Sequence, residues 1–383
     1  MVHLGILTAH HYPRLGGMEY ATHFIANELQ KSSSIQVSLS CNSLKGISKE
    51  VAYKYNCYRA KSLSYLTPWL FKYNQDKMIR EQKVNLLYGP MLHGGGYYCY
   101  NQSLRHNIPF IAHSHGSDVQ TVAPISYGAL LDDNLKKRVE TVIKNADHLI
   151  AVSQINKTNM IDLGAEESKI SIIHNGIHMD MINAIPFECK RAFLGVEQDD
   201  FLVISVGRNK PVKRIELLFE AFKKLKDYEK IKCISVGPFE ELVDLAKKHD
   251  VLDKVIFTGQ IPKQKEAIAH PPFPDLINLY RSANLYVSTS YVEAFSLAAT
   301  EALACGIPVI IGEKHGVKDV IYEGKTGWIM DKETPSYLAD MILDLYNKKA
   351  YIKKNDKLIK DSVAHLTWKN VANQMKQTYK KVL

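Results

Sequence analysis

Two glutamates eight positions apart, Glu293 and Glu301, lie in a stretch that predicts a strand, a loop, a helix and a second strand. Apolar residues from 285 to 289 predict a buried strand, and a helical repeat follows. Gly306 ends the predicted helix, because glycine tolerates the left-handed conformation after a helix C-terminus. At about 100° per residue, positions eight apart differ by only about 80° around a helix, so the two carboxylates could flank one ligand. The alternative is a helix with two solvated acids.

The start of this helix predicts an anion site. The first turn of a helix has unpaired N–H groups and a positive dipole end, which bind phosphate or sugar oxygens. Open parallel sheets bind ligands beyond the carboxyl ends of their strands, which is where this helix would begin. The residues that would surround such a ligand are Ala294, Phe295, Ser296 and Leu297.

Two cations follow another predicted strand, at residues 201–206. Arg208 and Lys213 lie on the loop between this strand and a helix that we expect from about residue 215 to 225. Two cations on such a loop suit a diphosphate, because they neutralise its charge without a metal. Donors that already point at a leaving diphosphate would also lower the barrier to its departure. The alternative is a pair of surface charges.

The first half of the chain opens with a predicted strand, a glycine-containing loop and a helix. Gly16 and Gly17 close the loop, but the sequence G-x-G-x-x-G is absent, so a dinucleotide site is not supported. Further on, a strand at 110–112 leads into HSHGSD, which contains His115. At neutral pH a histidine can donate a hydrogen bond to a sugar hydroxyl or a developing oxyanion.

Length and composition limit the class of protein. A chain of 383 residues with 46% hydrophobic and 23% charged residues predicts a globular protein of two domains. No apolar run approaches the roughly 20 residues that span a bilayer, and the N-terminus does not resemble a signal peptide. We therefore expect a cytoplasmic protein.

The net charge of +9 is spread over the chain: residues 1–183 carry 18 Lys and Arg against 14 Asp and Glu, and the remainder carries 31 against 26. This distribution argues against a nucleic-acid arm, whereas a mildly basic surface suits phosphorylated donors or an anionic membrane. The six cysteines form no C-x-x-C pair and no metal-binding spacing, so we expect reduced thiols.

The motifs together resemble the retaining, nucleotide-sugar-dependent glycosyltransferases of the glycosyl transferases group 1 family, which includes sucrose and glycogen synthases. The family signature is S-x-x-E-G-F-G-L-x-x-x-E-A-x-A-x-G-x-P-V, with two glutamates in an E-x7-E arrangement. This chain matches it with Ser290, Glu293, Phe295, Leu297, Glu301, Ala302, Ala304, Gly306, Pro308 and Val309. Arg208 and Lys213 also match the family pattern. The chain departs from the pattern at Ala294, Ser296 and Arg214, because glycine is common at these three positions in the family.

The resemblance implies a fold and a domain organisation. It implies an α/β protein of the GT-B type, with two doubly wound Rossmann-like domains facing a central cleft. We expect an acceptor-binding domain at 1–183, joined by a C-terminal helix that crosses back at about 366–383. The expected nucleotide-sugar-binding domain is 184–365. The absence of a D-x-D sequence disfavours the metal-dependent glycosyltransferase fold.

The resemblance also implies roles for residues. His115, Glu293, Arg208 and Lys213 would be catalytic, and Ile261 would contact the base. The other expected donor-binding residues are Gly16, Gly17, Arg208, Lys213, Glu293, Ala294, Phe295, Ser296, Leu297 and Glu301. The expected donor is a UDP- or GDP-linked sugar, with no cofactor and no metal.

The expected acceptor is a hydroxyl of a sugar, a lipid-linked glycan or a small molecule, in the synthesis of cell-surface polysaccharide or glycoconjugate. Peripheral association with the inner face of an anionic membrane is a further expectation, and a nucleic-acid partner is not expected.

Two other classes of function stay open. A sugar-nucleotide epimerase of the same architecture would convert its nucleotide-sugar without an acceptor. A non-catalytic relative would bind nucleotide-sugars or partners, with residues 263–275 as its contact loop. Three prolines exclude a regular helix through that segment.

Overall fold

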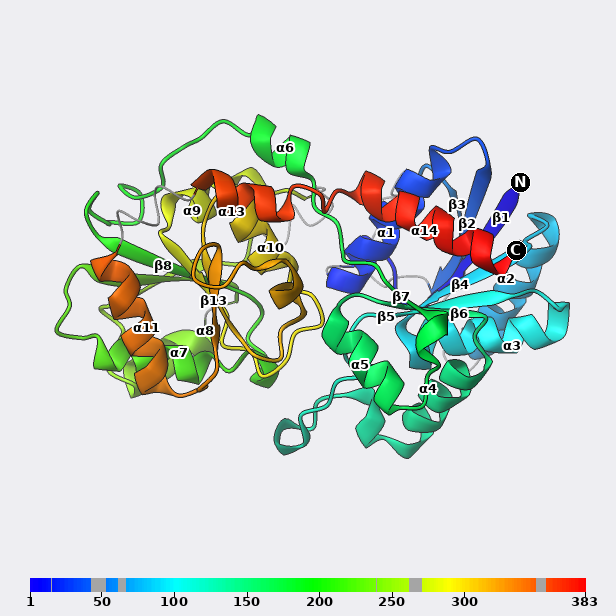
Figure 1. Cartoon of the computed structure of the whole chain (residues 1–383), viewed down its shortest axis with the longest axis horizontal. Coiled ribbons are helices and arrows are strands. Elements are labelled where there is room, and N and C mark those ends of the chain that lie inside the picture. The colour runs from blue at the N-terminus through cyan, green and yellow to red at the C-terminus, as the bar shows by residue number, and fades with distance from the viewer. Residues whose placement is uncertain (15, 43–52, 61–66, 239, 262–270, 349–355) are drawn as a thin grey trace. The chain divides into compact units, whose positions relative to one another are not determined.

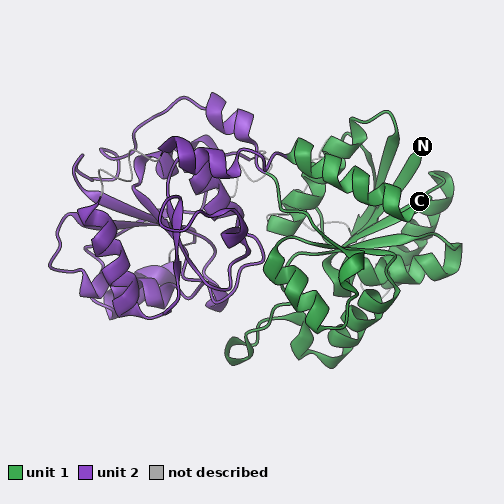
Figure 2. Ribbon diagram, viewed as in Figure 1, with its two compact units in different colours: residues 1–176, 368–383 green, residues 177–367 purple. Residues whose placement is uncertain are grey.

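The strand-forming segments of the sequence assemble into two parallel sheets in the computed structural model of the protein. The structure describes residues 1–14, 16–42, 53–60, 67–238, 240–261, 271–348 and 356–383. The chain divides into two units: unit 1 contains residues 1–176 and 368–383, and unit 2 contains residues 177–367 (Figure 2). The predicted domain borders lie a few residues from this division. Most of the predicted insertion at 263–275 lies outside the described residues.

The sheet of unit 1 has the strand order β3-β2-β1-β4-β5-β6-β7, and every neighbouring pair is parallel. Its strands are nearly continuous apolar runs, as expected of a parallel sheet that is buried on both faces. Ile6 packs into the core on one face and Leu7 into the core on the other. The strands are β1 (Val2–Leu7), β2 (Ile35–Asn42), β3 (Asn56–Ala60), β4 (Leu86–Pro90), β5 (Phe110–Ser114), β6 (His148–Ala151) and β7 (Ile170–Ile172).

Helices cover both faces of this sheet (Figure 1). One face packs against α1 (Gly17–Gln30) and α14 (Trp368–Val382), which lie side by side. The other face packs against α2 (Thr67–Glu81), α3 (Tyr97–His106), α4 (Asp133–Asn145) and α5 (Gln154–Asp162). Because α14 buries Trp368 and Met375 in the core of unit 1, the prediction that the C-terminal helix returns to the first domain is confirmed.

The segment His93–Gly96, with the sequence HGGG, is helical although it contains three glycines. Residues Met91–Gly96 form a π-helical turn that continues into α3. A Cβ atom at Gly95 would lie 2.4 Å from the carbonyl oxygens of Leu7 and Pro90. Glycine therefore lets this turn pack directly against the ends of β1 and β4.

The sheet of unit 2 has the strand order β10-β9-β8-β11-β12-β13, again with parallel neighbours. One face shares a core with α7 (Ile215–Lys224), α8 (Glu240–Lys248) and α11 (Pro335–Asn347). The helices α9 (Pro274–Ser282), α10 (Leu297–Ala304) and α13 (Asp356–Val363) pack together, and Tyr280 of α9 contacts Tyr286 of β11. The strands are β8 (Phe201–Val206), β9 (Ile231–Val236), β10 (Val255–Gly259), β11 (Leu285–Val287), β12 (Val309–Gly312) and β13 (Gly327–Met330).

Short helical segments complete the fold: α6 (Met179–Ala184) and the 3₁₀ turns at Ala123–Ile125, Ala129–Leu131, Glu167–Lys169, Pro211–Lys213 and Gly316–Val320. No helix among the described residues is both long enough and apolar enough to cross a bilayer.

Each sheet has one point where the strand order reverses. In unit 2, β9 follows β8 in the sequence and pairs with one side of it, whereas β11 pairs with the other side of β8. In unit 1, the same reversal separates β1 from β4. Ligands of open parallel sheets bind beyond the carboxyl ends of the strands at such points. The loops after β8 and β11 therefore lie where a ligand of this sheet would bind.

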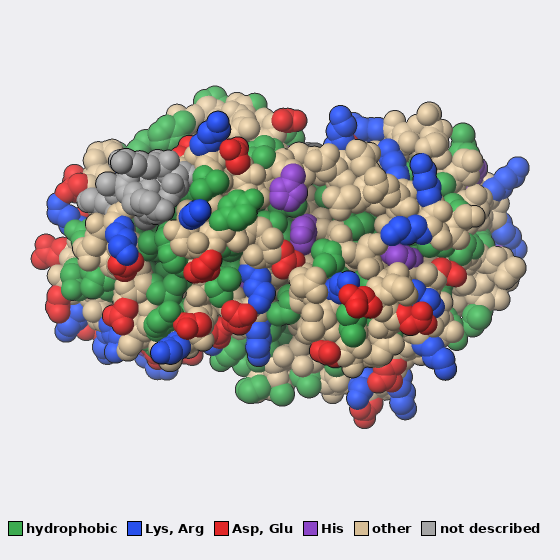
Figure 3. Space-filling view, viewed as in Figure 1, with side chains coloured by type: hydrophobic (Ala, Val, Ile, Leu, Met, Phe, Trp, Pro, Cys, Tyr) green, Lys and Arg blue, Asp and Glu red, His purple; other side chains and the backbone are tan. Residues whose placement is uncertain are grey.

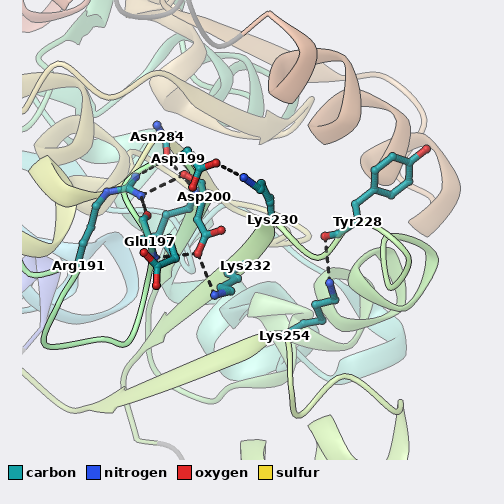
Figure 4. Close-up of polar contacts among 10 residues, drawn as sticks. Arg191, Glu197, Asp199, Asp200, Tyr228, Lys230, Lys232, Lys254 and Asn284 are labelled. Carbon is teal, nitrogen blue, oxygen red and sulfur yellow. Dashed lines mark hydrogen bonds and ion pairs between the residues drawn. The ribbon is translucent and has the colours of Figure 1, made fainter.

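A polar cluster at the opposite, amino edge of the unit 2 sheet is structural (Figure 4). Arg191 donates to the carbonyl oxygens of Glu197 and Asp200, at 2.8 and 3.1 Å, and to Oδ1 of Asn284 at 2.7 Å. Lys232 forms an ion pair with Asp200 at 2.8 Å. These contacts fix the segment that leads into β8.

Candidate functional site

Three loops of unit 2 meet at the carboxyl edge of its sheet. They follow β8 (residues 207–214), β11 (residues 288–296) and β12 (residues 313–315), and these strands are neighbours. Backbone hydrogen bonds join the loops directly. The amide of Tyr291 donates to the carbonyl of Val212 at 2.9 Å, and that of Glu293 donates to the carbonyl of Lys314 at 3.1 Å. The site is therefore built on a rigid sheet edge.

Glu293 is the centre of this arrangement. Its Oε1 atom forms an ion pair with Lys213 and accepts a hydrogen bond from Oγ of Ser290 at 3.0 Å. Burial alone would raise the pKa of Glu293, but the charge of Lys213, together with hydrogen bonds from Lys213 and Ser290 to the carboxylate, leaves its pKa below the usual value. Glu293 is therefore an anion at neutral pH, and it holds the lysine in a defined position.

His315 supports this loop from the end of β12. Its fully buried ring donates from Nε2 to the carbonyl oxygen of Ser290 at 2.8 Å, while Nδ1 has no partner among the described residues. Burial lowers the pKa of His315, so the ring is neutral at physiological pH. Sequence reasoning did not find His315. Its position just beyond a strand end was the signal that could have indicated it.

The start of α10 presents open amides beside Glu293. Ser296 caps the helix, and its Oγ accepts from the amide of Ala299 at 3.3 Å. No described residue accepts a hydrogen bond from the amides of Leu297 and Ala298. Ser296 has a φ of −75°, so a residue other than glycine at this position causes no strain.

Glu293 precedes α10, which begins at Leu297, and Glu301 lies inside it, as the sequence predicts. Because Glu293 pairs with His315 in an isolated bridge outside the helix, an angle around one helix does not describe the two carboxylates. Glu301 is half-buried, and burial raises its pKa to about 7, although a weak 3.5 Å hydrogen bond from Tyr280 opposes this shift. The two carboxylates therefore differ in charge near neutral pH.

Two predicted residues are not brought into this cluster. Arg208 is exposed and makes no hydrogen bond or ion pair with any described residue. Ile261 follows β10, which is separated from β8 by β9. The role of Ile261 toward a base and the role of Arg208 toward a phosphate stay predictions.

His115 belongs to unit 1, where it follows β5. Its ring lies 4.2 Å from that of His113, and its Nε2 atom has no partner among the described residues. Burial lowers the pKa of His115 to about 4, although the carboxylate of Asp118 opposes this shift. Asp118 also accepts hydrogen bonds from the amides of Leu92 and Gly116, both at 2.9 Å. His115 is thus a neutral imidazole at physiological pH, and its role toward a donor sugar stays a prediction.

Gly16 and Gly17 lie at the start of α1, beyond the end of β1. Gly16 is the N-cap, and a Cβ atom there would lie 2.2 Å from Oε2 of Glu19. The glycine lets this carboxylate fold back over the helix start. The predicted contact of this loop with a donor, and a cleft between the two domains, stay predictions.

Charged groups elsewhere do not indicate another kind of site. In the described part of the chain, no three His, Cys, Asp or Glu side chains are grouped as metal ligands. On the face shown in Figure 3, Lys and Arg are interspersed with Asp and Glu rather than gathered in one basic stripe. Independence of a metal stays a prediction.

Solved glycosyltransferase structures share the whole fold. The sucrose-phosphate synthase of Thermosynechococcus elongatus matches with a TM-score of 0.82 at 19% identity, over 100% of this chain and 99% of that one. Anabaena Alr3699/HepE in complex with UDP-glucose matches with a TM-score of 0.75 at 20% identity, over 99% and 100%. The chain therefore has the two-domain GT-B fold of glycosyltransferases.

Family models identify each half of the chain. Residues 15–181 match Glycosyltransferase Family 4, and residues 187–363 match Glycosyl transferases group 1. The two matches fall one on each of the two parallel-sheet units.

Curated relatives include the D-inositol 3-phosphate glycosyltransferase of Mycolicibacterium smegmatis, which is 27% identical over 252 residues, or 64% of this chain and 55% of that protein. The protein of the same name from Mycobacterium sp. (strain KMS) is 30% identical over 200 residues, or 50% and 43%. The chain spans about half the length of the curated relatives it matches.

Proposed function

We propose that the chain transfers a sugar from a nucleotide diphosphate-sugar to a hydroxyl acceptor, with retention of the anomeric configuration. The observation that carries this proposal is the pair Lys213–Glu293 beside the open amides of α10, at the point where the strand order of unit 2 reverses. The glycosyltransferase family matches support the reaction class. The complexes of HepE with UDP and with UDP-glucose support a nucleotide-sugar as the donor.

Each group in the site takes a distinct part of the donor. Lys213 and Arg208 neutralise the diphosphate, and the amides at the start of α10 hold a phosphate oxygen. Glu293 accepts hydrogen bonds from the sugar, and Glu301 accepts them from the ribose hydroxyls. The donor is a UDP- or GDP-linked sugar.

The reaction breaks the bond between the anomeric carbon and the phosphate oxygen. A bond from the acceptor oxygen to the anomeric carbon forms on the same face of the sugar. The proton of the acceptor hydroxyl passes to the departing phosphate oxygen. Because negative charge grows on the diphosphate as this bond breaks, the cations Lys213 and Arg208 stabilise the transition state more than the bound donor.

We also propose peripheral association with an anionic membrane, where lipid-linked acceptors for polysaccharide or glycoconjugate synthesis would be found. Trp69 and Tyr73 on α2 are 63% and 52% exposed, and their rings stack at 5.7 Å. The exposed cations Lys72, Lys77 and Arg80 lie on the same helix. Aromatic rings beside Lys and Arg favour the interface of an anionic bilayer.

The donor assignment is tested with a thermal-shift panel of UDP- and GDP-linked sugars, followed by transfer assays with hydroxyl acceptors. A donor at 100 times its Kd should stabilise the protein by about 2.7 kcal/mol. Lys213→Ala should abolish most of this shift and lower transfer by about a hundredfold or more, because a preorganised cation is lost. Arg208→Ala should lower transfer similarly, and its stability should change little because Arg208 is exposed and makes no hydrogen bond or ion pair with the described residues.

Lys232→Ala is the matched control, since Lys232 also pairs with a carboxylate but lies at the opposite edge of the same sheet. It should bind donors normally. Near-normal transfer by Lys213→Ala would contradict the assignment, and conversion of a nucleotide-sugar without an acceptor would indicate an epimerase instead.

A further inference from the structure

Arg214, the residue after Lys213, has an unusual backbone conformation. Its φ and ψ angles are 48° and 49°, in the left-handed region that residues with a Cβ atom rarely occupy. It precedes α7 without capping the helix through its side chain. A left-handed arginine persists only where its surroundings hold it, so its side chain is expected to make several contacts.

The side chain makes three such contacts, all with residues of unit 2. Nε donates to the carbonyl oxygen of Thr289 at 3.0 Å, and Nη2 donates to Oε2 of Glu333 at 2.7 Å. The guanidinium also lies over the ring of Tyr291, 4.4 Å from its centre. The side chain is only 14% exposed. Its planar fork therefore spans two loops, which the single ammonium of a lysine could not do.

The backbone on both sides of Lys213 is attached to the same loop. Oγ1 of Thr289 lies 3.0 Å from the carbonyl oxygens of both Lys213 and Arg214 and shares its hydrogen between them. The amide of Tyr291 donates to the carbonyl of Val212. The backbone on both sides of Lys213 is thus held against the loop after β11, and the side chain of Lys213 extends from there to Glu293.

We propose that Arg214 is a positioning residue for the donor site: it fastens the loop after β8 to the loop after β11 so that the ammonium of Lys213 is held where the donor diphosphate binds. This inference rests on the proposed function. A lysine stem has many rotamers, and a free loop would add more. Fixing the loop before the donor arrives removes this ordering cost from donor binding and from the transition state.

The test is Arg214→Gly, assayed with the donor identified in the thermal-shift panel. Glycine adopts the left-handed conformation without strain, which offsets part of the stability lost with the contacts of Arg214, so the variant should still fold. Its kcat/KM for the donor should nevertheless fall by about tenfold or more. In a Lys213→Ala background, Arg214→Gly should add less than about a threefold loss, because both changes remove the same interaction. Arg214→Lys should recover only part of the activity.

Asp250→Gly is the matched control, since Asp250 is an exposed residue of unit 2 with a φ of 58°. It should leave kcat/KM unchanged. Wild-type kcat/KM in Arg214→Gly, or a loss that multiplies with that of Lys213→Ala, would overturn the role of Arg214 while the proposed function stands. A wild-type chain that neither binds nor turns over any nucleotide-sugar would overturn the proposed function and this role together.

Discussion

At the scale of single residues, two glutamates of one motif have opposite electrostatic environments. Glu293 faces Lys213 and Ser290, so it stays ionised although it is buried. Among the described residues, Glu301 accepts only a weak hydrogen bond from Tyr280 and has no cation partner, so burial dominates and its pKa rises to about 7. The two side chains are chemically identical, but their different surroundings give them different degrees of ionisation near neutral pH.

Donor affinity should depend on pH through Glu301. With a pKa of about 7, this carboxyl is about one-tenth ionised at pH 6 and about nine-tenths ionised at pH 8. A carboxylate accepts hydrogen bonds from two hydroxyls better than the neutral acid does, so ribose binding favours the ionised form. The dissociation constant of the nucleotide-sugar should therefore fall by up to about tenfold from pH 6 to pH 8, as measured by calorimetry.

Glu301→Gln is the control for this pH dependence. It has no charge to gain, so its donor affinity should be weaker at pH 8 and nearly constant across the range. The phosphates of a nucleotide-sugar do not titrate between these pH values, which leaves the protein as the source of any change. A pH dependence that persists unchanged in Glu301→Gln would contradict the assignment.

At the scale of elements, the start of α10 combines a capping residue with open amides. Ser296 satisfies the amide of Ala299, which leaves the amides of Leu297 and Ala298 oriented for a ligand. The sequence predicted this helix, its Gly306 terminus and the strands on both sides. It did so because short-range signals decide these elements: an apolar run, a helical period and a glycine with a φ of 80°.

Ser296→Ala should weaken both the helix start and the donor site. Loss of an N-cap costs about 1 kcal/mol, so the free energy of unfolding of unit 2 should fall by this amount in a urea titration. Donor binding should also weaken severalfold, because the first turn frays and its amides lose their fixed direction. Isothermal titration with the nucleotide-sugar measures the second effect.

Ser153→Ala is the comparison variant, since Ser153 caps α5 in unit 1 with the same 3.3 Å hydrogen bond to an amide. It should cost unit 1 a similar free energy and leave donor affinity unchanged. Equal effects of the two substitutions on donor affinity would show that α10 has no special part in binding.

At the scale of the whole molecule, excess positive charge and exposed aromatic residues have a common explanation in the proposed membrane association. The net charge is +9, and α2 exposes Trp69 and Tyr73 beside three cations. Neither feature is needed by the core of unit 1, which α2 completes with Met78 and Ile79 from its other face.

The protein should sediment with vesicles of phosphatidylcholine and phosphatidylglycerol and not with vesicles of phosphatidylcholine alone. Binding should weaken as salt rises, because the attraction of the cations to the lipid is screened. Replacing both Trp69 and Tyr73 by serine should lower the apparent affinity for the vesicles at least tenfold, since two interfacial rings are lost.

Tyr322→Ser is the control, because Tyr322 is 54% exposed but lies in unit 2. It should bind vesicles like the wild type. Undiminished binding of the Trp69 and Tyr73 variant would rule out α2 as the contact surface.

The sequence by itself determined the two α/β domains and most strands and helices, because apolar periodicity and glycine or proline at element ends act over a few residues. It could not show that Lys213, Ser290 and Glu293 touch, or that His315 and Arg214 support them. Those contacts join residues that are up to 80 positions apart. They exist only because β8, β11 and β12 are neighbours whose carboxyl ends share one edge.

Tertiary packing also decided the cases in which local reasoning failed. The π-helical turn at Met91–Gly96 forms because Gly95 fits against the carbonyl of Leu7, a contact that no local pattern reports. The separate charge states of Glu293 and Glu301 depend on burial and on partners from other elements. The sequence specifies which chemical groups are present, whereas the distances between them and their dielectric environment are set only when distant segments pack together.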